Sequence, residues 1–256
     1  MAGRDTDQSI PLQTWAALST RRARRGAEPL VTYVDARSTS NERTELSAAS
    51  VENSVAKIAN ALRDEFDIGP GAAVGLHLPW HWQRSLWWGG CASVGARVVP
   101  YGSPEVVDLV ACTLDDVPSL AGVPGSGAGE ILVVSLHPMG LPITEALPAG
   151  FIDAARVVRA QPDAFWPDAH SSQAEVHVRI PDASAPGQRV LVACQESAPG
   201  FEPAQSWAWP LAIPLATDGS VVMVATSGDP GHDPDAIARL AAQERADQVV
   251  LLELQT

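Results

Sequence analysis

A short polar segment near the C-terminus has residue types that can serve chemistry at a phosphate. Thr226–Gly231 lies between a predicted strand and a predicted helix, where backbone N–H groups can bind phosphate oxygens. Asp229, Asp233 and Asp235 add negative charge that no nearby cation offsets, so we expect an ordinary turn with Asp233 or a nearby polar group capping the helix. If a nucleotide binds, the candidate contact residues are Thr226, Ser227 and Gly228.

The chain has a single lysine, Lys57, and all its other side-chain cations are arginines. Any reaction that requires a lysine must therefore use Lys57. This residue lies inside a predicted helix and off its apolar face, as does Glu52. We predict that Lys57 is solvent-exposed and dispensable for ligand binding.

Histidines and cysteines are too scattered to predict a metal site. His77 and His81 are four residues apart, a spacing that suits zinc on a helix, but Pro79 interrupts the segment and no third ligand is near. His232 lies beside Asp233 and is similarly incomplete. The three cysteines, which are far apart, are Cys91, Cys112 and Cys194. We predict neither a metal site nor a disulfide framework.

Pairs of residues suited to nucleophilic catalysis are equally few. Two nucleophiles lie close in sequence to a polar partner: Ser135 to His137, and Cys194 to Glu196. Neither lies in the Gly-x-Ser-x-Gly turn that exposes a catalytic serine. We therefore predict no catalytic residue.

Tryptophan is concentrated in one short segment. Half of the eight tryptophans are Trp80, Trp82, Trp87 and Trp88. At the carboxyl end of a buried strand they can line an apolar ligand pocket, with candidate residues Trp80, His81 and Trp82. The alternative is a core or a partner-facing surface, and Trp207 and Trp209 can mark a further exposed face.

Composition excludes several classes of protein. The chain of 256 residues is 46% apolar and 18% charged, with a formal net charge of −13. This favours a packed core and disfavours nucleic-acid partners, whose phosphates an acidic chain repels. No apolar run reaches the roughly 18–20 residues of a membrane span, and residues 1–29 hold no signal peptide, so we expect a cytoplasmic location. The arginines at 21, 22, 24 and 25 are expected on a solvated helix face.

Strands and helices alternate along the sequence. Predicted strands cover residues 30–34, 73–78, 97–100, 106–112, 131–136, 175–180, 189–193, 221–225 and 248–252. Predicted helices cover residues 12–23, 48–66, 81–96, 114–120, 151–160 and 234–245, and polar or glycine-rich loops cover 37–44, 122–129 and 161–174. The pattern predicts an α/β fold with a doubly wound, mostly parallel sheet. We expect one domain over residues 1–256, which includes an N-terminal helix and linker in residues 1–28.

An ordered set of short motifs runs through residues 29–102. In chain order they are Val31-Thr32-Tyr33, Ala59-Asn60-Ala61-Leu62, Gly69-Pro70-Gly71, Leu78-Pro79, Gly95-Ala96 and Val98-Val99-Pro100. Their order and spacing resemble the N-terminal subdomain of adenylate-forming enzymes, which include acyl-CoA synthetases, nonribosomal-peptide adenylation domains and luciferase-like ligases. Residues 186–193 and 214–224 resemble later strands of that family. Residues 103–185 fit poorly, although residues 135–142 resemble a stretch in short actinobacterial proteins of unknown role.

The resemblance implies which chemical groups an active member would carry. Such enzymes bind ATP with a loop that ends in Pro-Lys-Gly, and no such sequence occurs here. Counterparts of the family's ribose-binding aspartate and C-terminal catalytic lysine would lie beyond Thr256. Because charge developing on phosphate needs cationic or metal groups, we predict a degenerate half-domain without adenylation activity. We expect no cofactor, with ATP and AMP disfavoured.

Two functions follow from this expectation. The first is binding of a small apolar, acyl-type ligand or of a protein partner. The alternative is an AMP-forming acyl-CoA synthetase-type ligase, which works alone or with a separate partner half. A surviving ligand site is expected at the carboxyl ends of the parallel strands, near Leu78–Trp82 and Thr226–Gly231, and should prefer an apolar or weakly cationic ligand.

Overall fold

The computed structural model describes residues 9–37, 42–99, 105–120, 129–181, 185–195, 207–227 and 233–252. The predicted glycine-rich connector at 122–129 lies almost entirely outside these residues, and Gly228 lies outside them too.

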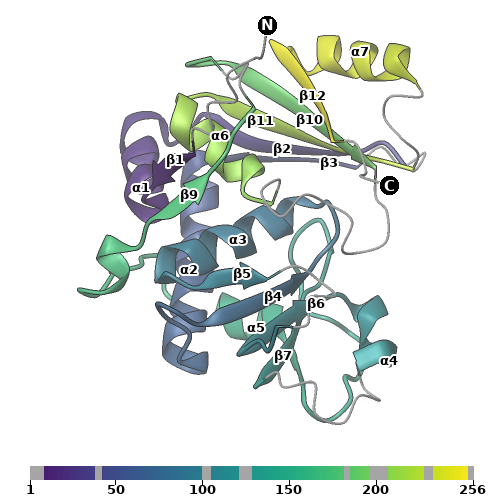
Figure 1. The fold of residues 1–256 in the computed structure, drawn as a ribbon. Coiled ribbons are helices and arrows are strands. Elements are labelled where there is room, and N and C mark those ends of the chain that lie inside the picture. Colours follow the sequence, from purple (N-terminus) through teal and green to yellow (C-terminus); the bar gives the residue numbers. More distant parts are fainter. Residues whose placement is uncertain are drawn as a thin grey trace, which may run out of the picture.

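Two five-stranded sheets carry the fold (Figure 1). The first sheet has the order β12 (Gln248–Leu252), β10 (Arg189–Gln195), β11 (Ser220–Thr226), β2 (Pro29–Asp35) and β3 (Arg43–Ser47). The second sheet has the order β5 (Arg97–Val99), β4 (Ala73–His77), β6 (Leu109–Cys112), β7 (Glu130–Val133) and β8 (Phe151–Asp153). A small antiparallel pair joins β1 (Ile10–Leu12) to β9 (Val176–Val178). Every pairing in the two large sheets is parallel except β2 with β3.

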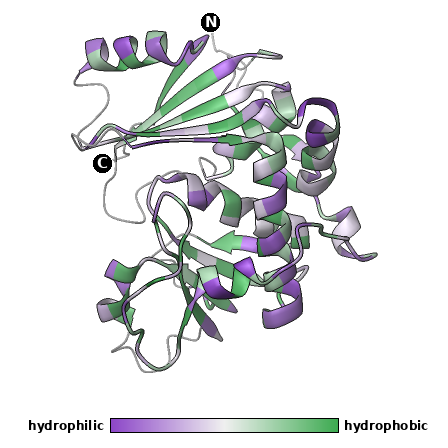
Figure 2. Cartoon of the chain, turned by 180° about the vertical axis from the view of Figure 1, so that it is seen from behind, coloured by the Kyte–Doolittle hydropathy of each residue, from purple (hydrophilic) through white to green (hydrophobic). Residues whose placement is uncertain are grey.

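Helices fill the space between the two sheets and cover the first sheet from outside (Figure 1). The helices are α1 (Thr14–Arg25), α2 (Ala48–Phe66), α3 (Trp82–Val94), α4 (Val117–Leu120), α5 (Ala154–Arg159), α6 (Trp209–Thr217) and α7 (Pro234–Gln243). The middle layer contains α2 and α3, and α7 lies on the outer face of the first sheet. Figure 2 shows hydrophobic residues concentrated in the strands of both sheets, and no helix of the described residues is long and apolar enough to cross a membrane.

The helix α2 forms where its local sequence predicts it. The Ser47 hydroxyl accepts a hydrogen bond from the Ser50 backbone N–H at 3.2 Å, which caps the first turn. The predicted apolar stripe is buried at Val51, Val55 and Leu62. Asp67 ends the helix in the left-handed conformation with φ 53°.

The helix α3 packs unusually close to its neighbours because two of its residues lack a side chain. A Cβ on Gly90 would lie 2.4 Å from Ile58 Cγ2, and a Cβ on Gly89 would lie 2.8 Å from Leu211 Cδ1. The two glycines therefore allow α3 to pack closely against α2 and α6. Gly95 ends the helix with φ 81°, as its position near the predicted C-terminus indicates.

The α/β class is confirmed, and β4 and β5 pair in parallel on either side of α3 in the chain, while several local predictions change. The predicted loop at 37–44 runs into the antiparallel strand β3, the predicted helix at 151–160 begins with β8, and the apolar segment 209–217 forms the unpredicted helix α6. The strands also divide between two sheets, because α2 and α3 separate them.

The arginine cluster is not the fully solvated face that we expected. Arg21 is buried, and its Nη1 donates to Asp218 Oδ1 at 3.1 Å. Arg22 pairs with Glu52 at 2.7 Å, and Glu52 is itself buried although it lies off the apolar stripe. These ion pairs hold α1 against α2 and against the turn before β11.

Candidate functional site

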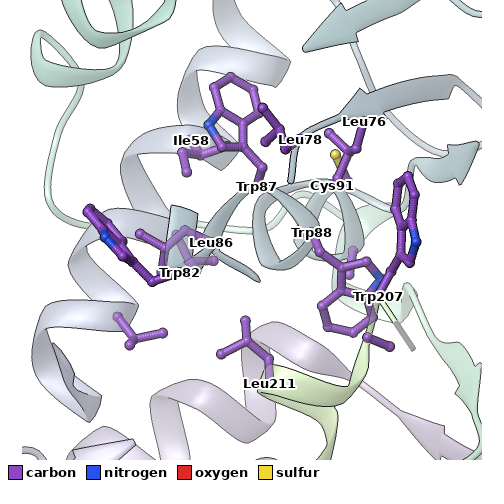
Figure 3. Packing of buried hydrophobic residues seen from close by; sticks show 14 of the residues in the cluster. Ile58, Leu76, Leu78, Trp82, Leu86, Trp87, Trp88, Cys91, Trp207 and Leu211 are labelled. Atoms are coloured by element: carbon purple, nitrogen blue, oxygen red, sulfur yellow. The ribbon is translucent and has the colours of Figure 1, made fainter. Parts of the chain in front are cut away.

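A cavity of about 320 Å³ lies at the carboxyl end of the second sheet. It opens between α2, the first turns of α3, the segment that follows β7, and α5. Its apolar lining consists mainly of Trp82, Leu86, Trp87, Val134, Leu141 and Val158. Figure 3 shows Trp82, Leu86 and Trp87 projecting from α3, with Trp87 beside Ile58 of α2. This volume is at the lower end of the range typical of small-molecule pockets.

The N-terminus of α3 is fixed by a set of polar contacts. The His81 Nδ1 accepts a hydrogen bond from the Gln83 backbone N–H at 3.3 Å and so caps the helix. The Gln83 side-chain amide donates to the Ser135 carbonyl, which ties α3 to the segment after β7. The Ser85 hydroxyl donates to the Trp82 carbonyl at 2.7 Å. The indole of Trp82 is therefore presented to the cavity by a rigid turn.

Two cations are the only charged residues that line the cavity, among the residues the structure describes. Lys57 Nζ donates to the Gln161 carbonyl at 2.8 Å and pairs with Asp163 at 2.7 Å. The side chain of Arg159, at the end of α5, forms no ion pair or hydrogen bond with any described residue. The lining thus contains one compensated and one uncompensated positive charge.

Contrary to the prediction, Lys57 is not solvent-exposed. Its side chain is 27% exposed and lines the cavity. The physical reason is that the segment after α5 folds back over α2 and offers Lys57 a carbonyl and a carboxylate. That arrangement is a long-range contact, which the helical periodicity of α2 does not contain.

The structure places the three predicted pocket residues in different environments; they are Trp80, His81 and Trp82. Trp82 lines the cavity, whereas Trp80 is fully buried in the core with the Arg84 guanidinium 5.8 Å from its ring centroid. His81 is buried as the cap of α3, and its ring lies 4.7 Å from that of Tyr33. Of the three residues that the sequence suggested, only Trp82 lines this cavity.

His81 lies where the two sheets approach each other, and its charge state is set by burial. Burial, with the nearby Arg37 charge, lowers the pKa of His81 to about 3, so the ring is neutral. Its Nε2 lies 4.0 Å from Glu42 Oε1, and burial raises the pKa of that carboxyl. His81 therefore positions α3 rather than acting as an acid or base near neutral pH.

The carboxyl edge of the first sheet holds polar groups that satisfy one another. Arg37 donates from Nε and Nη2 to the two carboxylate oxygens of Asp35, each at 2.8 Å. These hydrogen bonds lower the pKa of the Asp35 carboxyl. The Thr226 hydroxyl donates to the Cys194 carbonyl at 3.2 Å, and Ser227 is exposed. Of the predicted nucleotide contacts, Thr226 is thus engaged inside the sheet, and Gly228 lies outside the described residues.

The candidate nucleophiles are placed unfavourably for catalysis. Ser135 Oγ accepts from the backbone N–H of His137 at 3.3 Å, whereas the His137 Nδ1 accepts from Met139. The cysteines are buried, and burial raises the pKa of both Cys91 and Cys112 to about 12. No group of three metal-ligating side chains occurs among the described residues.

The second tryptophan pair does not form an exposed face. Trp207 is buried, with the Arg84 guanidinium 4.0 Å from its ring centroid, and Figure 3 shows it beside Trp88. Trp209 is half-buried and donates from Nε1 to the Arg179 carbonyl at 2.6 Å. The prediction failed because the helix α6 carries this segment into the core.

Two residues of the cavity lining that sequence reasoning missed are Arg159 and Gln83, whereas Ser135 was considered as a nucleophile and not as the hydrogen-bond partner of Gln83. Gln83 is signalled only by its place in the first turn of α3. Arg159 carries no local signal, because the β7–β8 connection is what brings α5 to the cavity.

Comparisons with known proteins agree with this architecture. No family model matches the chain. A protein from Mycobacterium tuberculosis described as a TIGR03089 family protein is 34% identical over 242 residues, which cover 87% of this chain and 91% of that protein.

Solved structures give the fold. An acyl-CoA synthetase from Brucella canis and an acetoacetyl-CoA synthetase from Streptomyces lividans each superpose with a TM-score of 0.64 and 18% identity. The R395G mutant of coronafacic acid ligase from Pectobacterium brasiliense superposes with a TM-score of 0.60 and 12% identity. Each match covers 93% of this chain but only 47%, 42% and 50% of the respective solved chains. The chain belongs to the TIGR03089 family, and its fold is that of the N-terminal subdomain of adenylate-forming enzymes.

Proposed function

We propose that this chain binds a small acyl-type ligand in the cavity at the carboxyl end of the second sheet and does not adenylate it. The observation that carries the proposal is the cavity itself, which has an apolar lining and a single uncompensated cation. It also favours ligand binding over protein docking as the primary role.

The size of the cavity sets the size of the ligand. A volume of about 320 Å³ is roughly ten times the ~30 Å³ that one water molecule, or one methylene group of similar size, occupies. An acyl chain of about eight to ten carbon atoms is therefore the expected upper size. Contact with Trp82 and Trp87 removes its apolar surface from water, at about 25 cal/mol per Å².

The charges of the lining set the polarity of the ligand. Arg159 has no partner among the described residues, so a carboxylate placed beside it gains a charge-assisted hydrogen bond. A nucleoside triphosphate carries several negative charges and a large polar body. It suits neither the apolar walls nor the single free cation.

The proposed lack of adenylation rests on groups that are already engaged. Lys57, the only lysine, is held on α2 by Gln161 and Asp163. Arg37, at the carboxyl edge of the first sheet, is bound by both oxygens of Asp35. Both cations would have to break an ion pair before they could stabilise a phosphate.

Calorimetric titration with decanoate tests the proposal. Val158→Trp fills the cavity from α5 and should weaken decanoate binding at least about tenfold. Val157→Trp changes the neighbouring residue, which does not line the cavity, and should leave affinity within about twofold. Equal affinities for wild type and both variants would place the ligand elsewhere, and absence of decanoate binding to wild type would reject the proposal.

The alternative is an acyl-CoA synthetase-type ligase, alone or with a partner that supplies further elements. The observation that favours it is that the three solved structures are synthetases or ligases about twice as long as this chain. It predicts carboxylate-dependent exchange of pyrophosphate into ATP, which our proposal does not.

A further inference from the structure

A second cavity, of about 430 Å³, lies beside the first, where the chain leaves β6 and β7. Three residues line both cavities: Val134, Ser135 and Leu141. Residues 134–141 therefore run between the two cavities, and we call this segment the partition. The apolar residues that line the second cavity are Leu114, Val134, Leu136, Leu141, Pro142 and Ile143.

The beginning of the partition is held by its backbone. The Val134 N–H donates to the Cys112 carbonyl at 2.8 Å, which continues the pairing of β7 with β6. The Ser135 carbonyl accepts a hydrogen bond from the side-chain amide of Gln83, which lines the first cavity. Hydrogen bonds to β6 and to α3 thus fix this part of the wall between the cavities, because moving it would leave polar groups unpaired.

The end of the partition depends on one side chain. The Gly140 N–H donates to the His137 carbonyl at 2.7 Å. The Ile143 N–H donates to Asp153 Oδ2 at 3.0 Å. These contacts hold the backbone on either side of Leu141, which is itself 38% exposed. A substitution at Leu141 therefore changes the wall between the cavities and leaves the backbone hydrogen bonds in place.

The charges of the two cavities differ in sign. Arg159 lines only the first cavity and has no partner among the described residues. The described lining of the second cavity contains two carboxylates, Asp115 and Glu145, and no lysine or arginine. Neither carboxylate forms an ion pair with a described residue. A fatty carboxylate should therefore keep its charged end beside Arg159 and direct its methyl end towards the second cavity.

We propose that Leu141 determines the length of the acyl chain that this protein binds. Its side chain closes the first cavity on the side of the second, so that a chain longer than about ten carbon atoms has no space. Removing that side chain lets the methyl end of a longer chain continue into the second cavity. This inference rests on the proposed function, because it assumes an acyl-type ligand in the first cavity.

The test is calorimetric titration of the full chain with decanoate and tetradecanoate, below the concentrations at which they form micelles. Wild type should bind tetradecanoate at least about threefold more weakly than decanoate, because four methylene groups remain outside the cavity. Leu141→Ala should tighten tetradecanoate binding at least about tenfold and leave decanoate within about threefold. Met139→Ala is the matched control, since Met139 lines only the first cavity and is 77% exposed, and it should leave the ratio of the two affinities unchanged.

Two further arms locate the methyl end of the chain. Leu114 is 36% exposed and lines only the second cavity, so adding Leu114→Asp to Leu141→Ala should cancel the gain for tetradecanoate and leave decanoate binding unchanged. Tetradecanedioate should gain nothing from Leu141→Ala, because its second carboxylate would lie beside Asp115 and Glu145. An equal gain for the two fourteen-carbon ligands would overturn the proposed direction of the chain.

The outcomes separate this inference from the proposed function on which it rests. Decanoate binding by wild type, without a gain for tetradecanoate in Leu141→Ala, would overturn the role of Leu141 alone. Wild type that binds both ligands equally would do the same, because Leu141 would then set no limit. Absence of decanoate binding to wild type would reject the acyl-type ligand itself and this inference with it.

Discussion

The carboxyl edges of the two sheets occupy equivalent positions in an open α/β architecture, yet they differ in what they leave available. At the first sheet, Asp35 and Arg37 form a two-point ion pair and the Thr226 hydroxyl is bound to Cys194. At the second sheet, a cavity of about 320 Å³ remains, with Arg159 unpaired among the described residues. The carboxyl edge of a sheet is where ligands tend to bind, but binding also needs unfilled space and unsatisfied groups.

The difference has a local cause. In the first sheet, the aspartate that ends β2 lies two residues before an arginine, so the ion pair closes within one turn. In the second sheet, the chain after β7 turns away at Gly140, which has φ 57°. The space that it leaves is bounded by α2, α3 and α5.

The largest expected effect is on the free energy of unfolding, and it comes from the packing of α3 against α2 between the two sheets. Gly90→Val places side-chain atoms where a Cβ alone would lie 2.4 Å from Ile58 Cγ2, and should lower the free energy of unfolding by about 3 kcal/mol. Gly69→Ala is the matched control, because a Cβ there meets nothing within 4 Å. Urea denaturation measures both. A Gly90→Val variant as stable as wild type would mean that α2 and α3 do not pack as described.

The next effect concerns His81, which connects the two edges. Its pKa is about 3 in the folded state and about 6.5 when unfolded, so the unfolded chain binds an extra proton between these values. Stability should therefore fall as pH drops below about 6.5, by up to about 1.4 kcal/mol per pH unit. His81→Asn keeps a helix-capping group and should remove this slope. An unchanged slope in urea denaturation at pH 6 and pH 4.5 would contradict a buried, neutral His81.

A smaller effect, on ligand affinity, tests whether Arg159 at the second edge binds the carboxylate of the ligand. Arg159→Gln should weaken decanoate binding about tenfold and leave decanol binding unchanged, because only the carboxylate uses the charge. Arg156→Gln is the control, since Arg156 pairs with Asp153 outside the cavity lining. Calorimetric titration compares the two ligands. Equal losses for acid and alcohol would show that Arg159 acts through structure rather than charge.

The smallest effect concerns the first edge. Arg37 lowers the pKa of Asp35 in the folded state, so this carboxylate stabilises the fold above about pH 4 and loses that contribution as pH falls further. Asp35→Asn should lower the free energy of unfolding at pH 7 by about 1–2 kcal/mol and leave decanoate affinity unchanged. Asp64→Asn, in an exposed pair, should cost less than about 0.5 kcal/mol. A loss of decanoate binding in Asp35→Asn would show that the two edges are not independent.

Local signals in the sequence predicted the elements that depend on local structure. The helix α2 follows from the Ser47 cap and a regular apolar stripe, and the parallel β4–α3–β5 unit follows from a short connection. The helix α6 escaped prediction because Pro214 lies inside it, within a run that is apolar on all sides.

The candidate site was predictable only in part, because some of its residues are brought there by long-range contacts. Trp82 lies four residues after the predicted strand 73–78 and was expected at the carboxyl end of the sheet. Lys57 and Arg159 belong to the site only because the chain after β7 returns to α2 through α5. Contacts between segments about a hundred residues apart, such as Lys57 with Gln161, leave no periodic pattern in either segment.

The most direct test of the contrast between the two edges is decanoate-dependent exchange of labelled pyrophosphate into ATP. The measurement is made on the wild-type chain at a decanoate concentration that saturates the cavity in calorimetry. We predict that decanoate binds and that exchange stays at the level of the enzyme-free control. Exchange that rises with decanoate and is lost in Arg37→Ala would contradict this prediction, because Arg37 at the first edge would then be needed for a reaction at phosphate.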